Sequence, residues 1–362
     1  MIRKLLAVTA ATALALGAAS ASAQAFKDLK PSAPLTLQGQ GSFYVGGRTI
    51  TSAARSGRPP AQDAYPAYPT GTWAVDQMYV QYMVPPNAKR RLPVVMIHGC
   101  CLSAKSWETT PDGRMGWNEY FVRKGRATYL AEQVGRGRSG FDATPYNLVR
   151  QGKAAPDSQP TINMMTAELG WDLFRFGPEP GKPWPDGQFP ADYLPEMAKQ
   201  VIPDLILSLP TPNPTFKALA ELSNELGGAV LIGHSQSGPH PQQAAQVDPR
   251  NIKGIVSIEP GNCASAAYKE ADYAILARIP TLVLYGDHIA DAKLPNWKTS
   301  VADCRAYVDK VKALGGDITL MFLPDIGIHG NSHMLMQDRN NLQVADVVLK
   351  WIDQHVERRA RR

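Results

Sequence analysis

Short runs of consecutive apolar residues recur along this chain, and segments with helical periodicity separate most of them. The run Val94-Val95-Met96-Ile97 is typical of a strand that is buried on both faces of a sheet. Strands that alternate with helices predict right-handed crossovers and a largely parallel, doubly wound α/β sheet. The expected strands lie near residues 41–50, 72–84, 92–98, 127–133, 229–233, 254–258, 281–285 and 318–323.

The regular spacing breaks once, in a stretch rich in Pro, Trp and Phe. Residues 141–211 are too many for one crossover and predict a lid-like insertion over one end of the sheet, with helices near 161–174 and 193–209. The insertion contributes aromatic residues that either line a pocket or pack the cap onto the sheet: Trp171, Phe174, Phe176 and Trp184. The α/β core then comprises residues 24–140 and 212–362, and residues 24–70 begin it as an extended arm.

The N-terminus has the three parts of a secretory signal peptide. Arg3 and Lys4 precede a short apolar run, and Ala21-Ser22-Ala23 supplies a small-residue cleavage pattern. We therefore expect residues 1–23 to be removed near Ala23 and the protein to be periplasmic or secreted. The apolar run is too short for a comfortable membrane crossing, so no membrane span is expected.

The formal net charge of +6 does not point to a polyanionic partner. The excess of basic residues lies in the signal peptide and in the tail, residues 357–362, which leaves the body nearly neutral. Basic residues are not interleaved with aromatic ones, so no nucleic-acid partner is expected. No metal-ligand spacing such as H-E-x-x-H occurs, and we propose no metal and no cofactor.

The strongest local motif is Gly233-His234-Ser235-Gln236-Ser237, directly after an apolar strand. It approximates the G-x-S-x-G nucleophile elbow of α/β-hydrolases, with Ser in place of the last Gly. In such an elbow a strained turn exposes the hydroxyl and directs a helix N-terminus at developing negative charge. The motif indicates that Ser235 is a nucleophile; otherwise Ser235 only caps the helix that follows.

A nucleophilic serine needs a base and an acid, which follow it in the chain order Ser, acid, His. Of the seven histidines, His329 and His333 come after the last expected strand, and we prefer His333 because a helical segment follows it. Two acids compete to orient this base. Asp287 and Glu259 each follow a buried strand, where a carboxylate needs a partner, and the pattern alone does not choose between them.

Two further loops follow strands at the same edge. His98-Gly99-Cys100-Cys101 lies where a hydrolase supplies one backbone N–H of its oxyanion hole, and the other would come from Gln236, after the nucleophile. Gly135-Arg136-Gly137-Arg138-Ser139-Gly140 matches the dinucleotide fingerprint literally, but no helix start follows it. We interpret this Gly/Arg loop as a turn near the rim of the site.

The four cysteines are expected to be paired in an oxidising compartment. Adjacent Cα atoms lie about 3.8 Å apart, below the usual disulfide range of about 4.4–6.8 Å. Geometry alone therefore predicts that Cys100 and Cys101 each bond elsewhere.

The constellation resembles a small group of secreted bacterial esterases within the α/β-hydrolases. In that group two adjacent cysteines form a disulfide at the oxyanion hole, and the triad acid is a Glu one strand earlier than usual. The motifs that match are Cys100-Cys101, Gly-His-Ser-Gln-Ser-Gly, Ile-Glu-Pro-Gly and Gly-Asn-Ser-His-Met. The resemblance covers about residues 90–350. It favours Glu259 over Asp287 and implies the disulfides Cys100–Cys101 and Cys263–Cys304.

This resemblance implies a secreted serine esterase that acts on a small-molecule ester through an acyl-enzyme on Ser235, with His333 as base and Glu259 as acid. A peptidase, a thioesterase or a lyase on the same fold is the enzymatic alternative. A secreted binding protein with a vestigial triad is the alternative from another class. A monomer and a homodimer are both compatible with the sequence.

Overall fold

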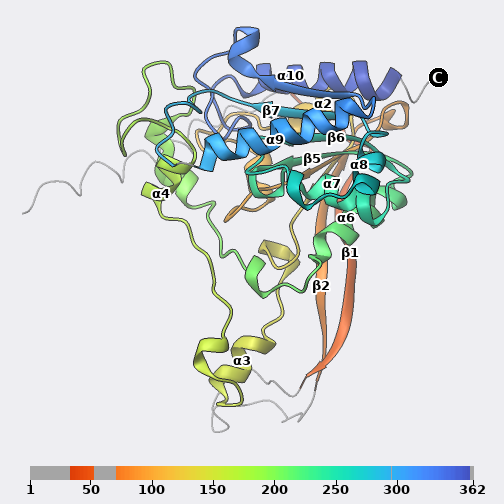
Figure 1. Ribbon diagram of the computed structural model, residues 1–362, viewed down its shortest axis with the longest axis vertical. Helices are drawn as coiled ribbons and strands as arrows, with labels where there is room; N and C mark the ends of the chain where they lie inside the picture. Colours follow the sequence, from red (N-terminus) through yellow and green to blue (C-terminus); the bar gives the residue numbers. More distant parts are fainter. Residues whose placement is uncertain (1–32, 53–70, 295, 359–362) are drawn as a thin grey trace, which may run out of the picture.

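The computed structural model describes residues 33–52, 71–294 and 296–358. Its centre is one eight-stranded sheet with the strand order β1-β2-β4-β3-β5-β6-β7-β8 (Figure 1). The strands are β1 (Gly39–Ser52), β2 (Gly71–Val84), β3 (Val94–Ile97), β4 (Thr128–Ala131), β5 (Ala229–His234), β6 (Ile252–Ile258), β7 (Thr281–Tyr285) and β8 (Ile318–Phe322). All eight strands expected from the apolar runs are present.

The sheet combines an antiparallel hairpin with a parallel core. β1 pairs antiparallel with β2, and β2 pairs antiparallel with β4. Every other neighbouring pair is parallel. The parallel strands end at the same edge, so the loops after β3, β5, β6, β7 and β8 can gather their side chains there.

Alternation along the central strands explains their continuous apolar sequences. In β3, Val94 and Met96 pack into one buried cluster, whereas Val95 and Ile97 pack into the cluster on the opposite face. β5, β6 and β7 divide their side chains in the same way, and each of these strands is almost entirely buried. A strand covered by helices on both faces needs no polar face, so its sequence does not alternate.

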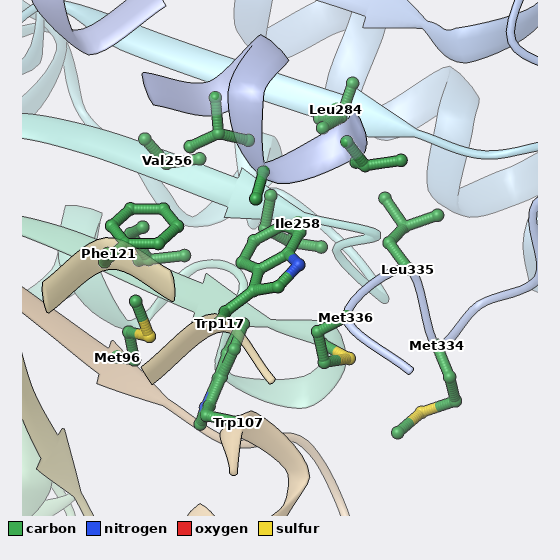
Figure 2. Close-up of a cluster of buried hydrophobic side chains, with 14 of the residues drawn as sticks. Met96, Trp107, Trp117, Phe121, Val256, Ile258, Leu284, Met334, Leu335 and Met336 are labelled. Carbon is green, nitrogen blue, oxygen red and sulfur yellow. The ribbon is translucent and has the colours of Figure 1, made fainter. Parts of the chain in front are cut away.

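Helices cover both faces. α2 (Trp117–Arg123) and α10 (Asn341–Ile352) lie on the face that Figure 2 shows, where Trp117, Phe121 and Met96 meet the segment Met334-Leu335-Met336. The opposite face carries α6 (Pro214–Glu225), α7 (His240–Val247), α8 (Glu270–Leu276) and α9 (Asn296–Ala313). α6, α9 and α10 form in segments with helical periodicity that lie between or after the apolar runs.

Residues 141–211 contain three short α-helices, α3 (Thr144–Arg150), α4 (Ala167–Leu173) and α5 (Leu194–Ala198). α4 and α5 are shorter than the sequence suggested, and α3 was not expected. α4 begins late, because Thr166 caps it and Asn163 forms an isolated bridge with Asp204. The same bridge, together with Pro203, which lacks an N–H, ends the helix that was expected to run from 193 to 209.

In Figure 1, α3 lies far from α4, towards the projecting end of the β1–β2 hairpin. The predicted signal peptide, residues 1–23, and part of the predicted arm lie outside the described residues. Among the helices that the structure describes, none combines the length and the apolar character needed to cross a membrane.

Candidate active site

Ser235 occupies a strained turn between β5 and the helical segment that leads into α7. Its φ of 58° lies in the left-handed region, which is unfavourable for a residue with a side chain. The turn is tight: a Cβ on Gly99 would lie 2.6 Å from the Cβ of Ser235, and one on Gly233 would collide with the carbonyl oxygen of Ser237. The two glycines therefore allow the chain to approach the serine closely.

Ser237, which stands where the elbow motif has Gly, is fully buried. Its hydroxyl donates to the carbonyl oxygen of Ile97 at 2.9 Å and accepts from the N–H of His234 at 3.0 Å. The side chain thus ties the end of β3 to the end of β5, so the departure from the motif keeps the turn intact.

His333 lies between β8 and α10 and is completely buried. Its Nδ1 is 3.0 Å from Oε2 of Glu259. Its ring stacks on Phe174, with 5.3 Å between centroids, and its backbone N–H donates to the carbonyl oxygen of Phe174. The other ring nitrogen, Nε2, is buried and has no hydrogen-bond partner within the described part of the chain.

Asp338 holds the loop that carries His333. Its carboxylate accepts from the hydroxyl of Ser332 at 2.6 Å, from the N–H of Ser332 and from the amide of Asn331, both at 2.9 Å. Burial raises the pKa of Asp338 to about 6, although these hydrogen bonds oppose the rise. The loop is therefore fixed from within, and the backbone on both sides of His333 is constrained.

Glu259 follows β6 directly and is completely buried, with a φ of 48°. Oε1 accepts from Nη2 of Arg175 at 2.8 Å and from the N–H of Gly286, while Oε2 faces His333. Arg175 comes from the segment 141–211, and its Nε donates to the carbonyl oxygen of Asp287 at 2.9 Å. Its guanidinium also lies over the ring of Trp297, at 4.6 Å from the centroid.

These contacts set the charges of the pair. Burial alone raises the pKa of Glu259, but the positive charge of Arg175 and the hydrogen bond with His333 outweigh it and lower the pKa to about 2. Burial lowers the pKa of His333, against the opposing pull of Glu259. At neutral pH the pair is therefore a carboxylate beside a neutral imidazole, the state in which an imidazole can accept a proton.

Asp287, the competing acid, makes a different set of contacts. Its Oδ2 accepts from the N–H of Gly330 at 3.0 Å, its Oδ1 accepts from the N–H of His288 at 2.7 Å, and His329 Nδ1 is 3.6 Å from Oδ2. The His329 side chain is 62% exposed. The structure thus forms two acid–histidine pairs, a buried one at Glu259 and His333 and a solvent-facing one at Asp287 and His329.

The loop after β3 lies beside the elbow. Cys101 has a φ of 58°, and its carbonyl oxygen accepts from the N–H of Ile202 at 2.9 Å. Gln236, on the other side, is partly exposed and directs its side chain toward Asp204. Cys100 and Gln236 are therefore linked through the carboxylate of Asp204, next to the turn that holds Ser235.

The cysteines divide into one bonded and one unbonded pair. Cys263 and Cys304 form a disulfide. Cys100 and Cys101 are both free thiols with sulfurs 2.7 Å apart, beyond the bonded distance of about 2.05 Å, so this structure contains neither the disulfide that the resemblance implies nor a bond from either residue to another cysteine. In this reduced state the Cys100 thiol donates to the carboxylate of Asp204 at 3.1 Å.

Two groups of described residues place three metal-ligating atoms within 4.8 Å of one another. The first is Cys100, Cys101 and Asp204, but Arg136 forms an ion pair with Asp204 and opposes a cation there. The second is Asp186, Asp287 and His288, in which the imidazole of His288 lies between carboxylates and stacks on Trp184. These hydrogen bonds and ring contacts account for the second cluster without an ion.

Sequence reasoning missed Arg175 and Asp204, and it placed the loop of Arg136 near the rim of the site without giving Arg136 a role. Arg175 stands in Phe174-Arg175-Phe176, and a charge between two buried aromatic residues could have indicated a buried ion pair. Arg136 was noticed only within a motif that resembled a nucleotide loop. No local pattern marks Asp204, which reaches the site through the tertiary structure.

Known proteins are similar to this chain over most of its length. A solved structure described as a novel bacterial esterase is 49% identical in sequence, with a TM-score of 0.83; the match covers 90% of this chain and 98% of that one. A fungal protein described as a probable secreted lipase, phiG, is 26% identical over 329 residues, 79% of this chain and 88% of that protein. No family model matches the chain.

Proposed function

The chain belongs to the bacterial esterases of the α/β-hydrolase superfamily and is a serine hydrolase of carboxylic esters, and we propose that it works through an acyl-enzyme on Ser235. The single observation that carries this proposal is the buried Glu259–His333 pair at the end of the sheet that holds Ser235, in which Nε2 of His333 has no hydrogen-bond partner among the described residues. A buried nitrogen with a free lone pair is costly unless a donor reaches it.

In the proposed reaction His333 Nε2 takes the proton of the Ser235 hydroxyl as Oγ attacks the ester carbonyl. Glu259 accepts from Nδ1–H, which leaves the lone pair on Nε2 and stabilises the imidazolium that forms. His333 then gives the proton to the departing alkoxide, and the acyl group remains on Ser235. Water, deprotonated by His333, releases the acid in the second half of the cycle.

The tetrahedral intermediate carries a negative oxygen, which needs donors that are already in position. We place there the N–H of Gln236 and an N–H of the Cys100-Cys101 loop. The left-handed φ values of Ser235 and Cys101 support this assignment, because both turn the backbone beside the nucleophile. Strain of this kind persists where the surrounding structure enforces it.

We propose that residues 141–211 act as a cap over this edge of the sheet. Three aromatic side chains of this segment, Trp171, Phe174 and Phe176, are buried in one cluster with the core, and Phe174 stacks on His333. Phe174 would therefore exclude water from the base, while the remaining cap would shape the space for acyl and alcohol groups.

We further propose that the protein is exported and that Cys100 and Cys101 close into a disulfide outside the cytosol. The N-terminal sequence, the Cys263–Cys304 bond and the description of the fungal relative as secreted support export. A disulfide oxidant would accept the two electrons and two protons of the thiols. The intact mass of the exported protein tests cleavage near Ala23. The mass of the proteolytic peptide that contains Cys100 and Cys101 tests the disulfide, which makes this peptide lighter by two hydrogens.

A fluorophosphonate probe and a short p-nitrophenyl ester test the acyl-enzyme. We expect one adduct, on Ser235, and an initial burst of nitrophenol equal to the enzyme concentration. Ser235→Ala should abolish both, whereas Ser237→Gly, which restores the usual elbow residue, should retain labelling. Folded wild-type protein without an adduct would make the binding-protein alternative correct. Faster turnover of amides or thioesters than of matched esters would favour another acyl hydrolase.

A further inference from the structure

The Gly/Arg loop after β4 sends one of its two arginines into the interior. Arg136 is 1% exposed, and its Nη2 forms an ion pair with Asp204, which is fully buried. Arg138, two residues on, points the other way and pairs with Glu132 near β2. A buried ion pair is expensive to desolvate and adds little net stability, so its presence beside the elbow invites a functional explanation.

The ion pair holds both ends of one side-chain amide, that of Gln236. Nε2 of Gln236 donates to Asp204 Oδ2 at 2.9 Å, and Oε1 accepts from Arg136 Nη2 at 2.9 Å. A donor and an acceptor of opposite charge therefore fix the orientation of the amide, and charge-assisted hydrogen bonds are stronger than neutral ones. Gln236 is the residue whose backbone N–H follows the nucleophile.

The same carboxylate also reaches the opposite loop. Asp204 Oδ2 lies 3.1 Å from the sulfur of Cys100, and Ile202, two residues before Asp204, donates its N–H to the carbonyl oxygen of Cys101. The backbone bond from Ile202 does not depend on whether the two cysteines are oxidised. Asp204 and its neighbours thus connect the two loops that border Ser235.

We propose that the Arg136–Asp204 ion pair is the positioning element of the oxyanion hole, holding Gln236 and the Cys100-Cys101 loop so that their backbone N–H groups converge on one point. This inference rests on the proposed function. Neither residue touches substrate in this account; both act through Gln236 and the adjacent loop. Ser235 and Cys101 have strained backbone conformations, which persist only while the surrounding structure enforces them. The ion pair would supply this constraint.

The first test compares Asp204→Asn with Glu357→Gln. Glu357 is a matched control, because it pairs with the buried Arg126 at 2.8 Å, at the C-terminal helix instead of the elbow. We expect Asp204→Asn to lower kcat about 10- to 100-fold with KM little changed, as for a misplacement of about 1 Å. Binding of phenylboronic acid, a tetrahedral mimic, should weaken by a similar factor. Glu357→Gln should lower the melting temperature without changing kcat.

A second variant, Gln236→Met, leaves the ion pair intact. It separates the effect of the pair on the oxyanion hole from its effect on the stability of the fold. It should lower kcat and boronate affinity together, while the acid limb of the pH profile stays in place because His333 keeps its partners. Adding Asp204→Asn to Gln236→Met should cost clearly less than Asp204→Asn costs alone. Equal costs in both backgrounds, or wild-type kcat in folded Gln236→Met, would overturn the inference.

Fluorophosphonate labelling of the wild type distinguishes a failure of the proposed function from a failure of the positioning role. Wild-type protein that carries no Ser235 adduct and turns over no ester removes the proposed function, and the positioning role with it. If the wild-type protein is labelled and hydrolyses esters, while Asp204→Asn and Gln236→Met keep the wild-type kcat and boronate affinity, only the positioning role is ruled out.

Discussion

Glu259 and Asp287 follow neighbouring parallel strands at the same edge of the sheet, yet their surroundings differ. Glu259 is fully buried and meets Arg175, the N–H of Gly286 and His333. Asp287 has a 23% exposed side chain and accepts mainly from backbone N–H groups. Position at a strand end therefore does not determine which carboxylate meets the buried histidine. The neighbours that other segments supply to each carboxylate differ, and only Glu259 meets Arg175 and His333.

Arg175 contacts both acidic residues, but it reaches the carboxylate of only one of them. Its Nη2 contacts the carboxylate of Glu259, whereas its Nε contacts only the backbone carbonyl of Asp287. Burial raises the pKa of Asp287, and hydrogen bonds from Gly330 and His288 reverse this and lower it. Both acids are thus ionised at neutral pH, but only Glu259 relies on a buried cation.

The largest expected effect comes from the two histidines. His333→Ala should lower kcat by about 10⁶-fold, because it removes the base of the proposed triad. His329→Ala, its matched control from the same loop, should leave kcat within about threefold, because a side chain this exposed acts through solvent-screened contacts. Steady-state kinetics on a p-nitrophenyl ester measure both. If His329→Ala lowers kcat more than His333→Ala does, the base is His329 and its acid is Asp287.

The two acids come next. Glu259→Gln should lower kcat by about 10⁴-fold, since an amide no longer holds His333 in the required tautomer. Asp287→Asn, with the same loss of charge, should cost less than about tenfold, because its partners are backbone groups and His329. If Asp287→Asn abolishes turnover while Glu259→Gln stays active, the acid is Asp287.

Arg175→Met tests the buried cation. Removing its charge raises the pKa of both Glu259 and His333, and activity needs the carboxylate and the neutral imidazole. The acid limb of kcat/KM should therefore move to higher pH, and Arg175→Lys should move it less. The free energy of unfolding should fall by about 3–5 kcal/mol, as when one partner of a buried pair is removed. A pH profile identical to that of the wild type would leave Arg175 with a purely structural role.

The smallest effect on turnover is expected from the Cys263–Cys304 bond, which ties the loop after Glu259 to α9 across a sequence separation of 41. Replacing both cysteines by Ala should lower the free energy of unfolding by about 4 kcal/mol through loop entropy. Denaturant unfolding measures this, and kcat at 25 °C should stay near that of the wild type. A collapse of kcat in folded protein would mean that the bond itself holds Glu259 in register with His333.

Strands were easier to predict than the inserted segment, and the reason is physical. The residues of β3 and β5 are buried on both faces, so their apolar runs follow directly from the fold. The expected helix at 193–209 ends at Ala198, because Asp204 pairs with Asn163, which lies 41 positions earlier in the chain, far outside the spacing of helical contacts. Local propensity cannot anticipate such a bridge.

The sequence by itself determined the α/β architecture, the elbow around Ser235 and the small set of acids and histidines that could serve it, because these depend on short-range patterns. Only the tertiary structure decided that Glu259 rather than Asp287 meets His333, that Arg175 lies against this acid, and that Arg136 and Asp204 hold Gln236. Those contacts join residues far apart in the chain, and a buried charge accepts whichever partner the fold brings within hydrogen-bonding distance.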